Sequence, residues 1–182
     1  MRTLSEHILD IVQNSIRANA TLIEIMVEED KIRDLCSLTI RDNGCGMSKE
    51  KLGKAINPFF TSRTTRKVGL GIPLIKHNAE AAGGCFSLES ELNTGTVLQA
   101  NFQLTNIDKP PLGDIWESLF QMFVSYNTGN LVYRHKTEKG EFQLSSDELK
   151  EVLGNVSYQH KEIREGILEL IKTNLEEIEV TK

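Results

Sequence analysis

Two side chains near the start of the sequence have the types and spacing to act on a metal-bound phosphate compound. Asp10 and Asn14 lie four residues apart in a segment with helical periodicity, so both fall on one face of the predicted helix. The side-chain oxygen of Asn14 suits Mg²⁺, a hard cation that binds oxygen ligands and phosphates. Asp10 can accept a proton from an attacking water that lies within about 3 Å of it.

A third candidate, Asp42, stands where a predicted strand runs into a glycine turn. Its carboxylate could accept a hydrogen bond from a purine amine, and Gly44 and Gly46 leave room for a flat ring. Taken alone, the sequence Asp42-Asn43-Gly44 is an ordinary turn signal. The purine interpretation therefore depends on the other candidates lying close by.

A basic segment follows the glycine turn. Residues 51–79 contain six basic side chains and no acidic one: Lys51, Lys54, Arg63, Arg66, Lys67 and Lys76. Gly69 and Gly71 lead into a predicted helix, and a helix N-terminus entered through glycines lets backbone N–H groups approach a phosphate closely. A local basic stretch in a net-acidic chain indicates a small anion held in one place rather than a nucleic-acid surface.

The elements that must position these residues follow from periodicity and turn signals. Residues 4–19 and 72–82 have helical spacing, a capped helix begins at Ser48, and residues 57–71 are predicted to form a mobile loop. Four segments are predicted strands, namely 21–27, 37–41, 85–92 and 96–104. This order, without strict βαβ alternation, predicts an α+β fold: a mixed sheet with helices on one face.

A change in composition at Pro110-Pro111 divides the chain. We predict one domain over residues 1–108 and a small α+β extension over residues 109–182. The extension is predicted to contain a helix (114–125), a hairpin (131–135 with 141–144), a short helix (146–153) and a final acidic helix (161–179).

Length and composition exclude several classes of protein. The chain has 182 residues, of which 39% are hydrophobic and 26% charged, as in a globular protein. Three cysteines without metal-ligand spacing argue against a disulfide scaffold and a structural zinc site, and fit a reducing compartment. The N-terminus lacks a signal-peptide pattern, and no apolar run approaches the ~18 residues of a membrane span. We therefore expect a cytoplasmic protein without a membrane segment.

The charge is unevenly distributed. The formal net charge is −5, and residues 137–182 hold 11 acidic and six basic side chains, whereas the preceding part is balanced. The acidic final helix is either a solvated face or a docking surface for a basic partner, and the sequence leaves both possibilities open.

Five short motifs, in order, resemble the N, G1, F, G2 and G3 boxes of the GHKL superfamily. They are residues 9–15 (LDIVQNS), 42–47 (DNGCGM), 57–61 (NPFFT), 69–72 (GLGI) and 94–96 (TGT). The superfamily includes sensor histidine kinases, DNA gyrase B subunits, large heat-shock chaperones and MutL mismatch-repair proteins. The resemblance covers about residues 1–105 and implies a Bergerat-type two-layer α/β sandwich that binds ATP beneath a mobile lid.

The resemblance implies roles for individual residues. Asn14 would be the Mg²⁺ ligand, Asp42 the adenine reader, and Thr96 a support for the adenine contact. The residues implied to shape the pocket are Gly44, Gly46, Met47, Gly69, Leu70 and Gly71. The lid segment carries Arg63, Arg66 and Lys67, of which at least one is expected to contact phosphate.

Two departures from the family pattern bear on activity. Hydrolysing members place Glu where this chain has Asp10, and the shorter side chain predicts slow hydrolysis. Only 13 residues precede Asn14, and none of the four histidines (His7, His77, His135, His160) is followed by an acidic residue, as a phosphoacceptor would be. Autophosphorylation of the sensor-kinase type is therefore not expected.

Three uses of Mg²⁺ and ATP remain open. As an ATPase, the chain would use Asp10 to activate water. As a protein kinase of the anti-sigma-factor type, it would phosphorylate Ser or Thr on a partner. As a non-catalytic switch, it would change conformation according to whether ATP or ADP is bound. We expect a protein partner that binds the extension or the lid, and a homodimer is possible. No nucleic-acid partner is expected.

Overall fold

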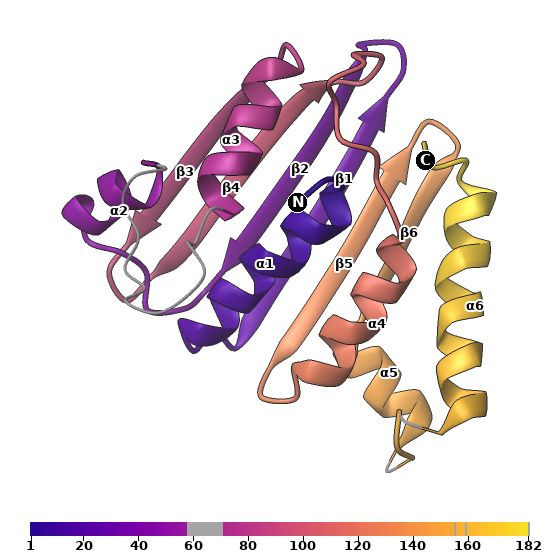
Figure 1. Ribbon diagram of the computed structural model, residues 1–182. Coiled ribbons are helices and arrows are strands. Elements are labelled where there is room, and N and C mark those ends of the chain that lie inside the picture. The colour runs from indigo at the N-terminus through magenta and orange to yellow at the C-terminus, as the bar shows by residue number, and fades with distance from the viewer. Residues whose placement is uncertain (58–70, 155, 159, 182) are drawn as a thin grey trace.

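A computed structural model describes residues 1–57, 71–154, 156–158 and 160–181. Its centre is a six-stranded mixed sheet with the strand order β3-β4-β2-β1-β5-β6 (Figure 1). The strands are β1 (Leu22–Asp30), β2 (Leu35–Asp42), β3 (Cys85–Glu91), β4 (Gly95–Gln103), β5 (Asn130–Thr137) and β6 (Gly140–Ser145). The helices are α1 (Leu4–Arg17), α2 (Lys49–Ala55), α3 (Gly71–Ala81), α4 (Ile115–Ser125), α5 (Ser146–Leu153) and α6 (Lys161–Glu177).

One parallel pairing joins the two halves of the chain. All neighbouring strands run antiparallel except β1 and β5, which are parallel. In this pair, Ile25 of β1 lies opposite Tyr133 of β5. The hairpin of β5 and β6 therefore extends the sheet formed by residues 22–103. The expected α+β class with a mixed sheet is confirmed.

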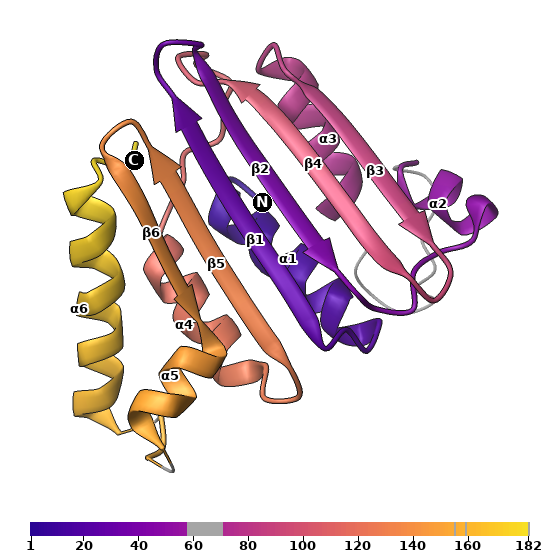
Figure 2. The same cartoon turned by 180° about the vertical axis from the view of Figure 1, so that it is seen from behind.

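The helices lie on one face of this sheet. Helices α1, α3 and α4 stand in front of the strands in Figure 1, α6 lies beside β6 at the edge of the sheet, and the view from behind shows the strands without a covering helix (Figure 2). The expected placement of helices on one face is thus confirmed. No helix in the described ranges is long and apolar enough to cross a membrane.

Helix α1 begins and packs as its sequence predicts. The Thr3 side chain accepts a hydrogen bond from the Glu6 N–H, which satisfies one of the free donors of the first turn. Ile8 and Val12 are fully buried against the sheet, whereas Asn14 on the other side is only partly covered. The apolar stripe therefore fixes which face of α1 is available to a ligand.

The hairpin of β1 and β2 is longer than the sequence predicts. The predicted strands end at residue 27 and resume at residue 37, whereas β1 continues to Asp30, and Glu29 pairs with Cys36. Glu29 is 4% exposed, accepts from the Thr181 N–H at 3.0 Å, and lies 3.0 Å from His135 Nε2. Burial raises the pKa of Glu29, but the hydrogen bonds from His135 and Thr181 outweigh it and lower the pKa below its usual value. These partners explain why an acidic residue lies inside a strand.

Candidate nucleotide-binding site

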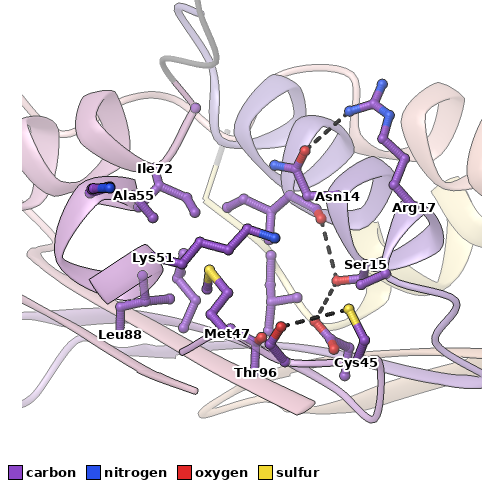
Figure 3. Close-up of a pocket in the computed structure, with 18 of the residues that line it drawn as sticks. Asn14, Ser15, Arg17, Cys45, Met47, Lys51, Ala55, Ile72, Leu88 and Thr96 are labelled. Atoms are coloured by element: carbon purple, nitrogen blue, oxygen red, sulfur yellow. Dashed lines mark hydrogen bonds between the residues drawn. The ribbon is translucent and has the colours of Figure 1, made fainter. Parts of the chain in front are cut away.

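A pocket of about 620 Å³ opens between α1, α2, the start of α3 and the ends of β2 and β4 (Figure 3). This volume lies in the range of roughly 300–1,000 Å³ that is usual for ligand sites. Six predicted site residues line it: Asn14, Asp42, Gly46, Met47, Gly71 and Thr96. Asp10 and Gly44 lie beside it in the described part of the chain, while Arg63, Arg66, Lys67, Gly69 and Leu70 fall outside the described residues.

Asp42 ends β2 at the edge of the pocket and is held at both carboxylate oxygens. The Gly44 N–H donates to Oδ1 at 2.9 Å, and the Ser15 hydroxyl donates to Oδ2 at 2.7 Å. Hydrogen bonds to an ionised carboxylate are stronger than those between neutral groups. The carboxylate is therefore fixed in orientation and keeps lone pairs for a ligand amine.

The glycine turn after Asp42 is shaped by close backbone contacts. Gly46 has a φ of 62°, and a Cβ there would lie 1.9 Å from the Glu91 carbonyl oxygen. Only glycine combines this left-handed conformation with such an approach. The Cys45 N–H donates to the Ala18 carbonyl at 2.9 Å, and the Cys45 carbonyl accepts from the Asn93 N–H at 2.9 Å. The turn is thus fixed to the end of α1 and to the β3–β4 turn.

Thr96 lies directly opposite Asp42 in the register of β4 and β2. Its hydroxyl lies 2.9 Å from the Ser90 hydroxyl, which also donates to the Gly95 carbonyl and accepts from the Met47 N–H, each at 2.9 Å. Ser90 therefore connects two of the predicted motifs. The network places a hydroxyl beside the carboxylate that is predicted to bind adenine.

Asn14 lies on the upper wall of the pocket in Figure 3, where Arg17 Nη1 donates to its Oδ1 at 3.1 Å. Within the described ranges, no group of three or more His, Cys, Asp or Glu residues could hold a metal ion by itself. A single amide oxygen fits Mg²⁺ all the same, because Mg²⁺ keeps several waters and is commonly completed by substrate phosphates.

Asp10 lies one turn before Asn14 and faces the start of α3. A Cβ built on Gly71 would lie 2.0 Å from Asp10 Oδ2, so the missing side chain of Gly71 leaves the space that this carboxylate fills. A carboxylate beside the first residue of a helix is stabilised by the helix dipole. The proposed role of Asp10 as a base stays a prediction.

The walls of the pocket divide into an apolar and a basic part. Ile40, Leu88 and Leu98 line the side formed by the sheet and are at most 9% exposed, which provides a flat apolar surface for a ring. Arg17, Lys51 and Lys54 line the opposite side together with one acidic residue, Glu50, which pairs with Lys54. Lys51 extends from α2 into the pocket (Figure 3).

Several residues in this arrangement were not predicted. Ser15 was visible as the neighbour of Asn14, but its contact with Asp42 spans 27 positions in the sequence. Ser90 carries no motif, and its role depends on the pairing of β3 with β4. Arg17 follows Asn14 by three residues, and this helical spacing could have indicated their contact.

Comparison with known families agrees with the geometry. The sequence pattern described as "Histidine kinase-, DNA gyrase B-, and HSP90-like ATPase" matches residues 2–106, more than half of the chain. A solved structure titled as the N-terminal domain of a DNA repair protein superimposes with a TM-score of 0.51 at 16% identity. It covers 79% of this chain and 52% of that one, which supports the fold.

Three curated relatives are named as sensor proteins. A putative sensor protein of Shewanella frigidimarina is 30% identical over 107 residues, covering 58% of this chain and 16% of that protein. The C4-dicarboxylate transport sensor protein DctB of Pseudomonas aeruginosa is 41% identical over 64 residues, covering 35% of this chain and 10% of that protein. The sensor histidine kinase YvrG of Bacillus subtilis is 28% identical over 98 residues, covering 52% of this chain and 17% of that protein. The chain thus spans less than a fifth of the length of these relatives.

The resemblance seen in the sequence motifs is confirmed: the chain belongs to the histidine kinase-, DNA gyrase B- and HSP90-like ATPase family, and residues 2–106 carry its ATP-binding domain.

Proposed function

We propose that the chain is a Mg²⁺-dependent ATPase with slow turnover whose nucleotide state regulates a protein partner. The observation that carries the proposal is the carboxylate of Asp42, held by Ser15 and Gly44 beside an apolar wall formed by Ile40 and Leu98. A fixed acceptor next to a flat apolar surface suits a purine that carries an amine.

The residues along α1 support a reaction at the phosphates. Asn14 would hold Mg²⁺, which when bound neutralises charge on the phosphate oxygens. Arg17 and Lys51 would attract the phosphate chain into the pocket, since both line it as cations. Asp10 would accept a proton from the attacking water, and because its side chain is one methylene shorter than Glu, we expect slow release of phosphate.

The division of the chain suggests how a partner could be regulated. We propose that residues 1–108 bind nucleotide and that residues 109–182 respond to it. Support comes from the first turn of α1, whose Leu4 and Ser5 N–H groups donate to the carbonyls of Pro111 and Leu112 at 2.9 and 3.0 Å. The helix that carries Asn14 is thereby bonded to the segment that begins the C-terminal part.

The test of hydrolysis is phosphate release from γ-labelled ATP with Mg²⁺, comparing the wild type with Asp10→Asn and with Gln13→Ala as a matched control on α1. We expect release that is lost in Asp10→Asn and kept in Gln13→Ala, because loss of a general base costs roughly 10²–10⁴-fold. Equal release from all three proteins would overturn the role of Asp10. Absence of release from a wild type that binds ATP would overturn the ATPase proposal.

A second candidate is transfer of the γ-phosphate to a protein, favoured by the sensor kinases among the relatives. Label that appears on an added protein rather than as free phosphate would identify this activity. Anti-sigma-type transfer to Ser or Thr and transfer to His differ in acid stability, because the phosphoramidate bond to His is hydrolysed in acid. Acid treatment of the labelled product therefore separates them.

A further inference from the structure

A second pocket, of about 480 Å³, lies between the segment before α4 and the C-terminal part of α6. Its apolar wall is formed by Pro111, Leu112, Ile115, Trp116, Leu175 and Val180. We call this pocket, with its charged rim, the α4–α6 groove. In Figure 1, α6 lies at the β6 side of the sheet and α2 at the β3 side, so the α4–α6 groove is remote from the nucleotide pocket.

Trp116 gives the groove a large aromatic surface. It is the only tryptophan in the chain, is partly buried against the core and lines the groove. Tryptophan is enriched in protein interfaces, where a large ring with a polar edge contributes much contact area. A cation placed over such a ring gains a further attraction.

The rim of the groove is acidic. Asp114, Glu176 and Glu179 line it, against the single cation Lys172. Asp114 stands at the N-cap of α4 but its side chain makes no capping bond, and Glu179 pairs only distantly with Lys139, at 3.7 Å. Neither Asp114 nor Glu176 has an ion pair with a described residue. Their charges are thus available to an incoming cation.

The acidic rim continues along the exposed side of α6. Glu165, Glu169, Lys172 and Glu176 are all exposed and follow each other at spacings of four, three and four residues, so they form one stripe. This stripe ends at the α4–α6 groove. Its three glutamates outnumber Lys172, and Glu165 pairs with Lys161 at 3.8 Å, so the stripe has a net negative charge that is strongest towards the groove.

We propose that the α4–α6 groove binds a protein segment in which Lys or Arg residues flank a bulky apolar side chain. The apolar side chain would enter between Trp116 and Leu175, and the basic residues would meet Asp114 and Glu176. A segment of this kind would be the partner in the proposed regulation, and the regulatory role of the groove rests on that proposed function. The binding itself is tested without nucleotide, so docking and ATP hydrolysis can fail independently.

Because Trp116 is the only tryptophan, its fluorescence reports directly on the groove. The probe is a short Trp-free peptide of Lys and Leu in helical spacing, and the control probe has Leu replaced by Ser. With the wild type we expect a saturable blue shift for the Leu peptide and none for the Ser peptide. Raising the ionic strength to about 1 M, where the Debye length is about 3 Å, weakens the binding.

The decisive comparison uses two neighbouring glutamates of α6, both exposed, of which only the first lines the groove. Glu176→Lys should weaken peptide binding by about tenfold, whereas Glu177→Lys, with the same change in net charge, should stay within about twofold. Equal weakening in both variants, or no saturable shift in the wild type, would overturn the proposal. A wild type that sediments as a dimer and becomes monomeric in Glu176→Lys would also overturn it, because a second copy would then occupy the groove.

Discussion

The Ser15 hydroxyl donates a hydrogen bond to Asp42 Oδ2 across 2.7 Å, which joins the helix that carries Asn14 to the strand end that carries the proposed adenine reader. Ser15 is 3% exposed, so this hydroxyl is held in place by packing. The bond fixes the carboxylate on the side opposite to the Gly44 N–H. We infer that Ser15 is a positioning residue for nucleotide binding.

Replacing Ser15 by Ala should weaken ATP binding by about tenfold, since one hydrogen bond to a charged group contributes roughly 1.5–3 kcal/mol and part of the loss is recovered by water. Ser37→Ala, on the open face of β2, is the control and should bind as the wild type does. Calorimetry measures both. Unchanged affinity in Ser15→Ala would show that Asp42 needs no support from α1.

Asn14→Ala should remove the dependence of ATP binding on Mg²⁺, because the variant loses the only oxygen that we assign to the ion. The measurement is ATP affinity with Mg²⁺ and with a chelator. Gln13→Ala keeps the dependence if the assignment is correct, because this neighbouring amide does not line the pocket. Persistence of the Mg²⁺ effect in Asn14→Ala would place the metal elsewhere.

Two glycines with opposite surroundings test the shape of the adenine side of the pocket. In Gly46→Ala the new Cβ would collide with the Glu91 carbonyl, and the alanine would have to adopt the left-handed φ of 62°. We therefore expect a loss of at least about 2 kcal/mol in the free energy of unfolding. Gly53 lies within α2, and outside its own helix no atom of a described residue comes within 4 Å of its Cβ position, so Gly53→Ala should stabilise by up to about 1 kcal/mol. Urea denaturation compares them, and equal effects would contradict the geometry of the turn.

His7 predicts a dependence of stability on pH. Burial, helped by the N-terminal ammonium, lowers the pKa of His7 from 6.5 to about 4, while Glu6 and Asp10 oppose this shift. Asn78 of α3 lies 3.0 Å from His7 Nε2 and can donate to the neutral ring. Between about pH 6.5 and pH 4, His7 binds a proton in the unfolded chain but stays neutral in the folded chain. The free energy of unfolding therefore falls as the pH drops through this range.

The loss over this range should reach about 3 kcal/mol at most, given about 1.4 kcal/mol for each unit of pKa difference. His7→Gln should remove this part of the pH dependence, and the exposed His160→Gln should keep it. Urea denaturation at a series of pH values measures the effect. An unchanged slope in His7→Gln would assign the acid sensitivity to other groups.

Much of the fold could be predicted because local patterns agree with the final packing. The alternation of Ile23, Ile25 and Val27 predicts a strand with one buried face, and all three are at most 1% exposed. The Ser48 side chain accepts from the Lys51 N–H, as its position before a helix predicts. Signals of this kind depend only on near neighbours in the sequence.

The parts that could not be predicted depend on distant contacts. The pairing of β1 with β5 brings Ile25 beside Tyr133, more than a hundred positions away, and no local pattern encodes it. Glu29 has the sequence character of a turn residue, and only the approach of His135 and Thr181 makes its burial possible. At the site, motif spacing indicated Asp42 and Thr96, but Ser90 is brought to them by strand register alone.

Binding of the adenine ring by Asp42, in the pocket between α1 and β2, underlies the proposed function. Its most direct test is calorimetry of ATP binding to the wild type, Asp42→Asn and the exposed control Asp108→Asn. We expect Asp42→Asn to weaken ATP binding by about tenfold to a hundredfold, because a charge-assisted hydrogen bond is lost and an amide donor faces the adenine amine. Asp108→Asn should bind as the wild type does. Equal affinity of all three proteins would contradict the assignment of the nucleotide site.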